Sequence, residues 1–319
     1  MPDLKPWRSF PEQLNILKSR GLQADDESAA LRYLERIGYY RLSGYWYGLR
    51  QIDRVESQAQ NRAVRLDEFM QGSRFKDIVN LYVFDKKLRL LALDALERIE
   101  MALRVDIAYL LGKKDPLAYA NPNCLHGNFT KQPIKSGPNK GKIGHELWLE
   151  KHESMLRRAK KEPFVQHHKR KYREELPIWV AIELWDFGML SHLFDGMKYA
   201  DKNQIAQKYK LDSGDELARW LRSLNFIRNV SAHHSRLWNI NVLEYANLPR
   251  NWPEMNPARP FMYFAMMAHL LSVICPNSTW TARLVGLLQD FPFKEGNLLT
   301  LDDFGVCDDW EKWMLQGEK

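Results

Sequence analysis

Apolar residues recur along most of this chain at the three- and four-residue spacing of an amphipathic helix. The longest such pattern covers 77–112 and stops at Gly112. Its apolar positions are Leu81, Phe84, Leu88, Leu91, Ala95, Ile99, Ala102 and Ile107. This spacing places the side chains near one face of a helix, and glycine is a frequent stop signal. We therefore expect one long helix here.

Shorter helices are expected on both sides of it. Ser9 and Gly21 are typical start and stop residues for a helix over 9–21. The aromatic stretch 39–52 predicts a turn or a short strand, and 67–71 predicts a short helix. No alternation of strands and helices is visible, so the predicted fold class is all-α. Further helical patterns cover 25–37, 145–173 with an interruption at Pro163, 177–194, 201–209, 214–238, 261–275 and 279–290.

Two regions are expected: an N-terminal helical, aromatic-rich region at 1–75, and a larger helical domain at 76–319 that carries a basic insertion at about 113–175. The 45% apolar content can fill a core, and three widely spaced cysteines do not suit a disulfide framework. The N-terminus has no apolar leader, and the apolar stretch 261–275 is too short to cross a bilayer. We expect a cytoplasmic protein.

Positive charge is concentrated in the segment 131–173. It holds 13 lysines and arginines against four glutamates, whereas the rest of the chain has 34 basic and 36 acidic residues. Such a patch is typical of proteins that bind a polyanion, most often a nucleic acid. A solvated surface segment is the alternative. The candidate RNA contacts here are Lys140, Lys142, Arg157, Arg158, Lys160, Lys161, Lys169, Arg170, Lys171 and Arg173.

Arg228, Asn229 and His233, followed by His234 and Arg236, form the motif with the clearest chemistry. Arginine can hold a phosphate through two donors, and histidine can transfer protons near neutral pH. RNA supplies its own nucleophile, the 2′-OH, so this chemistry needs no metal. No set of metal ligands is visible elsewhere, and we expect no cofactor.

The spacing within this motif raises a geometric problem. Residues five apart, such as Arg228 and His233, lie about 140° apart around a straight helix, whereas Asn229 and His233 are nearly stacked. Two solutions are open: the helix breaks near Ser231, or two copies of the motif meet across an interface.

The segment RNVSAHHSRLWN at 228–239 resembles the signature of abortive-infection (Abi-like) proteins of the AbiD/AbiF group, which belong to the HEPN superfamily of α-helical ribonucleases. Asn229 occupies the polar position after the arginine of that superfamily's motif. Four further segments resemble the same family in the same order, at 12–22, 37–46, 96–112 and 176–194.

The resemblance implies an all-α, HEPN-type helical bundle with an N-terminal helical extension and a basic loop and helix insertion. It also implies a homodimer that brings two motifs together, and metal-independent cleavage of RNA to a 2′,3′-cyclic phosphate and a 5′-OH. Relatives of the AbiF type are associated with a small structured non-coding RNA, which would explain the basic segment. In this interpretation His233 transfers a proton, Arg228 holds the scissile phosphate and Asn229 orients one of them. His234 and Arg236 are auxiliary phosphate contacts.

Several other polar residues are weaker candidates. Arg41 lies among tyrosines that could stack on unpaired bases, and is predicted to contact RNA. The tyrosines themselves are more often core residues. Glu183 is an unusual charge in an apolar run, and Arg228 is one candidate partner for it. Arg98, Glu100 and Arg104 are auxiliary candidates, although a salt bridge between the last two, four residues apart, is the more frequent role.

Two functions remain open from the sequence. The first is an antiphage ribonuclease toxin restrained by an RNA partner. The second is a non-catalytic module on the same fold that binds RNA or another partner. The basic segment fits both, and the intact set of Arg228, Asn229 and His233 favours the first.

Overall fold

A computed structural model describes residues 4–172, 175–293 and 298–316. These residues are mostly helical, which confirms the predicted all-α class. The α-helices are α1 (Phe10–Ser19), α2 (Glu27–Ile37), α3 (Tyr39–Trp46), α4 (Arg54–Gln60), α5 (Phe75–Gly112), α6 (Gly127–Thr130), α7 (Gly144–Arg158), α8 (Pro163–Lys171), α9 (Ile178–Ala181), α10 (Phe187–Asp195), α11 (Tyr199–Lys208), α12 (Gly214–Ala232), α13 (Phe261–Ile274), α14 (Trp280–Gln289) and α15 (Trp310–Gln316).

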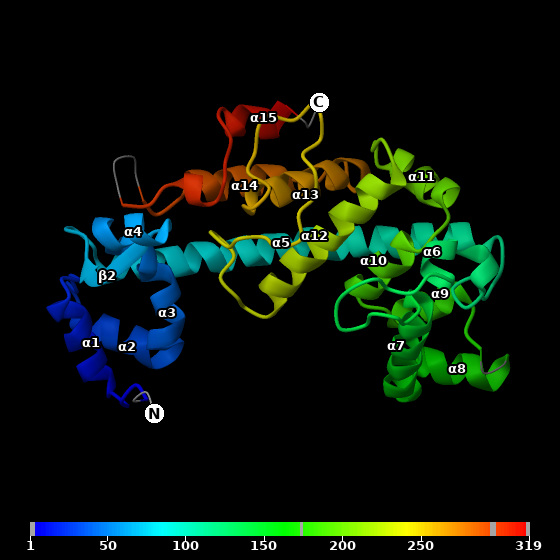
Figure 1. Ribbon diagram of the computed structural model, residues 1–319, viewed down its shortest axis with the longest axis horizontal. Coiled ribbons are helices and arrows are strands. Elements are labelled where there is room, and N and C mark those ends of the chain that lie inside the picture. Colours follow the sequence, from blue (N-terminus) through cyan, green and yellow to red (C-terminus); the bar gives the residue numbers. More distant parts are fainter. Residues whose placement is uncertain (1–3, 173–174, 294–297, 317–319) are drawn as a thin grey trace.

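Helix α5 is the central element of the fold. It runs along most of the length of the molecule, with α13 and α14 along one side and α12 crossing it near the middle (Figure 1). Its buried side chains include Leu81, Leu88 and Ile99, as the helical spacing predicts. Since α3, α9, α10, α12, α13 and α14 all contact α5, one helix organises a continuous apolar core.

Of the N-terminal helices, α2 and α3 contact α5, and α1 packs against α2 (Figure 1). A small antiparallel hairpin, β1 (Arg50–Asp53) and β2 (Val64–Phe69), follows α3. The helix predicted at 67–71 is therefore wrong, because 64–69 pairs with β1 and only Phe69 of that strand is buried. In the aromatic stretch, Tyr45 and Trp46 are core residues, whereas the Tyr40 side chain is exposed.

The segment 177–194 does not form the single helix that its apolar pattern predicts. It divides into α9, a 3-10 turn η4 (Ile182–Leu184) and α10. The break occurs because the Asp186 carboxylate accepts a hydrogen bond from the backbone N–H of Met189 at 2.7 Å and so begins a new helix. This break places Asp186 next to the insertion.

The insertion forms α6, α7 and α8 near one end of α5 (Figure 1). Helix α7 ends at Arg158 and α8 starts at Pro163, as the predicted interruption requires. An aromatic contact joins α7 to the bundle: the rings of Trp148 and Trp185 lie 4.8 Å apart. The Trp185 indole N–H also donates to Nδ1 of the buried His152 at 2.9 Å.

Helices α13 and α14 complete the core. Helix α13 is apolar on nearly all sides, and most of its side chains are buried against α5 and α12. Nowhere in the described ranges is there a helix with the length and apolar character needed to cross a bilayer.

Candidate functional site

The motif at residues 228–236 lies where helix α12 ends. The predicted helix over 214–238 is too long, because α12 stops at Ala232 and His233 is its last capping residue. The N–H of Ser235 donates to the carbonyl of Val230 at 2.9 Å, and that of His234 donates to Ser231 at 3.2 Å. This pair of bonds is a Schellman cap. The helix therefore breaks within the motif, and the meeting of two motifs remains a prediction.

His234 occupies the left-handed position of this cap, with φ of +57°. Glycine is the usual residue there, and a side chain in this conformation costs about 1–3 kcal/mol, so it persists only where the surrounding structure holds it. The chain after α12 is held in this way, by contacts from α3 and α5.

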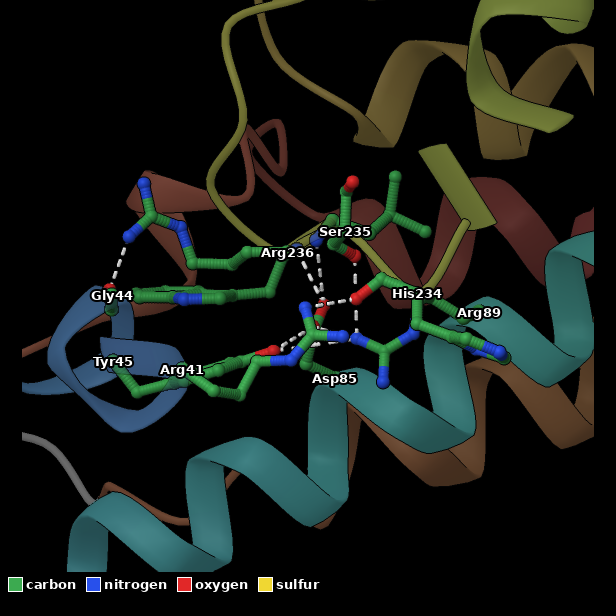
Figure 2. Close-up of polar contacts among 10 residues, drawn as sticks. Arg41, Gly44, Tyr45, Asp85, Arg89, His234, Ser235 and Arg236 are labelled. Atoms are coloured by element: carbon green, nitrogen blue, oxygen red, sulfur yellow. Dashed lines mark hydrogen bonds and ion pairs between the residues drawn. The ribbon is translucent and has the colours of Figure 1, made fainter. Parts of the chain in front are cut away.

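Asp85 of α5 is the main anchor (Figure 2). Its carboxylate is fully buried and accepts hydrogen bonds from the backbone N–H groups of Leu237 at 2.9 Å and Trp238 at 2.7 Å. The Tyr45 hydroxyl donates to it at 2.6 Å, and Arg89 forms an ion pair with it. Burial raises the pKa of Asp85, against the effect of these four partners. A residue more than 150 positions earlier in the chain thus fixes the backbone three and four residues after His234.

Two arginines fasten the same loop to α3 (Figure 2). The Arg41 guanidinium donates to the carbonyl of His234, and that of Arg236 donates to the carbonyl of Gly44. A side chain at Gly44 would press on the Arg236 guanidinium, with its Cβ at 3.0 Å. The sequence assigned both arginines to RNA. Here each one joins the loop to α3, and an additional contact with RNA remains a prediction.

Arg228 lies near the end of α12, four residues before Ala232, and within electrostatic range of Asp186. The pKa of Asp186 lies below its ordinary value. Burial acts in the opposite direction, but it is outweighed by the ion pair with Lys151 at 2.8 Å, the N–H of Met189 and the positive charge of Arg228. Arg228 also donates to the Asn229 side-chain oxygen at 3.3 Å. It forms no ion pair with any residue in the described ranges.

Glu183 does not pair with Arg228, the candidate partner named from the sequence. Its carboxylate pairs with Arg104 at 3.1 Å. Arg104 also pairs with Glu100 at 2.6 Å and donates to the carbonyl of Trp185. Arg98 pairs with Asp94 at 2.6 Å on the same helix. Arg98 also donates to the Ser278 hydroxyl at 2.8 Å. Arg98 and Arg104 therefore connect α5 to its neighbours, whereas Glu100 pairs within α5.

The side chains that the sequence assigns to chemistry are accessible. Asn229, His233 and His234 are exposed, and Arg228 is half-buried. Together they present amide, imidazole and guanidinium groups on a helix end whose backbone is fixed from two sides. No cluster of three or more metal-ligating side chains lies in the described part of the chain.

The basic candidates of the insertion are exposed in the loop before α7, at the end of α7, in the turn that follows and on α8. Among those that the structure describes, only Arg157 forms an ion pair, with Glu153 at 3.6 Å. Arg173 lies outside the described residues. These charges are therefore available to a polyanion.

Comparison with known proteins supports the resemblance. The family model for the Abi-like protein matches residues 32–239, which is well over half of the chain. The chain belongs to the Abi-like family. Its matched region starts in α2 and ends directly after Trp238, so it contains the motif, the basic insertion and both anchoring helices, α3 and α5. No curated protein and no solved structure matches. Membership of the Abi-like family associates the chain with abortive infection.

Proposed function

We propose that this Abi-like protein is a metal-independent endoribonuclease of the HEPN type that acts in antiphage defence. The observation that carries the proposal is the end of α12. There Arg228, Asn229 and His233 are accessible to solvent, while Asp85, Arg41 and Arg236 hold the backbone after them. Catalytic groups need a rigid support, and this support comes from two other helices.

The reaction would use the 2′-OH of the RNA as nucleophile. His233 removes the proton from the 2′-oxygen, which attacks the phosphorus, and the bond from phosphorus to the 5′-oxygen breaks. Arg228 stabilises the charge that develops on the phosphate, and Asn229, in hydrogen-bond contact with Arg228, orients it. An acid other than His233 protonates the leaving 5′-oxygen. The products are a 2′,3′-cyclic phosphate and a 5′-OH.

The direct experiment incubates the purified protein with total RNA in EDTA and analyses the fragment ends. Fragments with cyclic phosphate and 5′-OH ends support the proposal. RNA that is bound but remains intact would instead support a non-catalytic RNA-binding module.

Assembly gives a separate prediction. If two motifs form one composite site, the protein should be a homodimer with both Arg228 residues near the two-fold axis. Light scattering should give twice the chain mass at micromolar concentration, and cleavage should fall on dilution together with the dimer fraction. A monomer that cleaves RNA at full rate would exclude the composite site.

The basic segment is proposed to hold RNA, either the substrate or a small structured non-coding RNA. Replacing Lys169, Lys171 and Arg170 by alanine should then weaken RNA binding and reduce its salt dependence. Each lost phosphate contact should lower the slope of the logarithm of the binding constant against the logarithm of the salt concentration by about 0.7–0.9.

The matched control removes the same charge from the N-terminal half of the molecule. Arg54, Arg62 and Lys76 are exposed and form no ion pair in the described ranges, so their replacement by alanine should leave the slope nearly unchanged. Equal slopes for the two triple variants would mean that α8 is only a solubilising surface.

A further inference from the structure

A cavity of about 690 Å³ lies between the insertion and the helices α10, α11 and α12. Its walls include His126, Asn128 and Asn139 from the insertion, and Tyr199 and Asn225 from the bundle. We call it the insertion pocket. It has the volume of a site for a small organic molecule, and it is lined by both polar and aromatic side chains.

The uncommitted polar groups of the insertion pocket are mostly neutral amides. Within the described ranges, the side chains of Asn128, Asn139 and Asn225 have no hydrogen-bond partner. His126 accepts the N–H of Asn128 at Nδ1, at 3.1 Å, so its neutral form carries the proton on Nε2 and can donate. Each amide offers both a donor and an acceptor. This is the combination that reads the edge of a nucleobase.

The charged groups of the insertion pocket are already paired. Lys202 pairs with Asp215 at 2.6 Å, and Arg222 pairs with the pocket residue Asp195 at 2.9 Å. Lys151 pairs with Asp186. A phosphate would have to compete with these carboxylates, whereas an uncharged base would not. The pairing therefore favours a base over a phosphate as occupant.

Aromatic rings supply the apolar part of the walls. Tyr199 is half exposed and packs edge-on against the His126 ring, with 4.8 Å between the ring centres. Phe129 lies over Gly196, where any side chain would overlap its ring. A planar base can stack on such rings, which contribute affinity without selecting a sequence, while the amides select among the bases.

Two residues that line the insertion pocket, Asn225 and Lys151, connect it with the motif. Asn225 is three residues before Arg228 on α12, which is about one helical turn. Lys151 lines the insertion pocket and pairs with Asp186, a carboxylate on which the positive charge of Arg228 also acts. An RNA strand whose scissile phosphate contacts Arg228 would thus bring a neighbouring nucleotide to the insertion pocket.

We propose that the insertion pocket binds the nucleobase next to the scissile phosphate and determines which base is accepted at the cleavage site. This inference rests on the proposed ribonuclease function for its role, and on the insertion pocket itself for the binding of a base.

The first test measures binding without cleavage. The four ribonucleoside 3′-monophosphates are titrated separately into the full-length protein, and binding is followed by tryptophan fluorescence, since Trp148 lines the insertion pocket. One base should bind more tightly than the others. Asn225→Ala and Asn128→Ala, from opposite walls, should each remove roughly 5- to 150-fold of that preference, the range for a base held by paired hydrogen bonds. Asn15→Ala, on the exposed face of α1, is the control and should change nothing.

The second test maps cleavage sites by sequencing 5′-OH ends. Asn225→Ala should broaden the base preference next to the cut while cleavage continues. An unchanged preference in folded Asn225→Ala and Asn128→Ala, together with unchanged nucleotide binding, would overturn the proposal. If the wild type does not cleave RNA but its base-selective binding depends on Asn225, the ribonuclease function fails and the base-binding pocket stands.

Discussion

Replacing His233 by alanine is expected to slow RNA cleavage by about 10²–10⁴-fold and to leave RNA binding nearly unchanged. A histidine that transfers a proton contributes mainly in the transition state, so its loss lowers the rate more than the affinity. His233 is exposed at the end of α12, and its imidazole has no hydrogen-bond partner within the described ranges. Its removal should therefore not disturb the fold. Single-turnover cleavage and filter binding measure the two effects separately.

The neighbouring residues provide the controls. His234→Ala should reduce the rate less than His233→Ala if His233 transfers the proton. Arg228→Lys should also lose activity, because an ammonium keeps the charge but not the two-pronged contact with phosphate. EDTA should leave the wild-type rate unchanged. Equal rates for folded His233→Ala and wild type would overturn the catalytic role of His233 and favour the non-catalytic RNA-binding module.

Replacing Asp85 by alanine should lower the free energy of unfolding by about 3–5 kcal/mol. The change removes the acceptor of two backbone N–H groups and of Tyr45, and leaves the buried Arg89 without its carboxylate. An uncompensated buried charge is the largest part of this cost. Urea denaturation measures the loss, and RNA cleavage should fall as well because the loop after His234 loses its main support.

Asp94→Ala is the matched control for Asp85. Asp94 lies on the same helix and pairs with Arg98 and Arg283, but its side chain is 32% exposed. Its loss should cost only about 0–1 kcal/mol, the range for surface ion pairs. The double variant Asp85→Ala/Arg89→Met should be more stable than Asp85→Ala alone. If Asp85→Ala and Asp94→Ala cost the same, Asp85 is not the anchor that the structure indicates.

The features of this protein that depend on residues close together in the chain could be predicted from its sequence. The apolar spacing over 77–112 indicated α5 almost to the residue, because helix bonds and caps join positions only a few residues apart. The interruption at Pro163 and the concentration of charge in 131–173 were visible for the same reason. The motif at 228–233 was visible as a set of residue types, and the family match over 32–239 includes it.

The tertiary structure alone decided how these pieces are held. Asp85 bonds to Leu237 and Trp238 about 150 residues later, Arg41 bonds to the carbonyl of His234, and Glu183 pairs with Arg104. A single sequence contains no signal for such pairs, since any buried carboxylate could satisfy several arginines or backbone N–H groups. The break at Asp186 was hidden because the apolar pattern continues across it. Packing against α5 and α7 selects one arrangement from these alternatives, and that arrangement supports the end of α12 beside the insertion pocket.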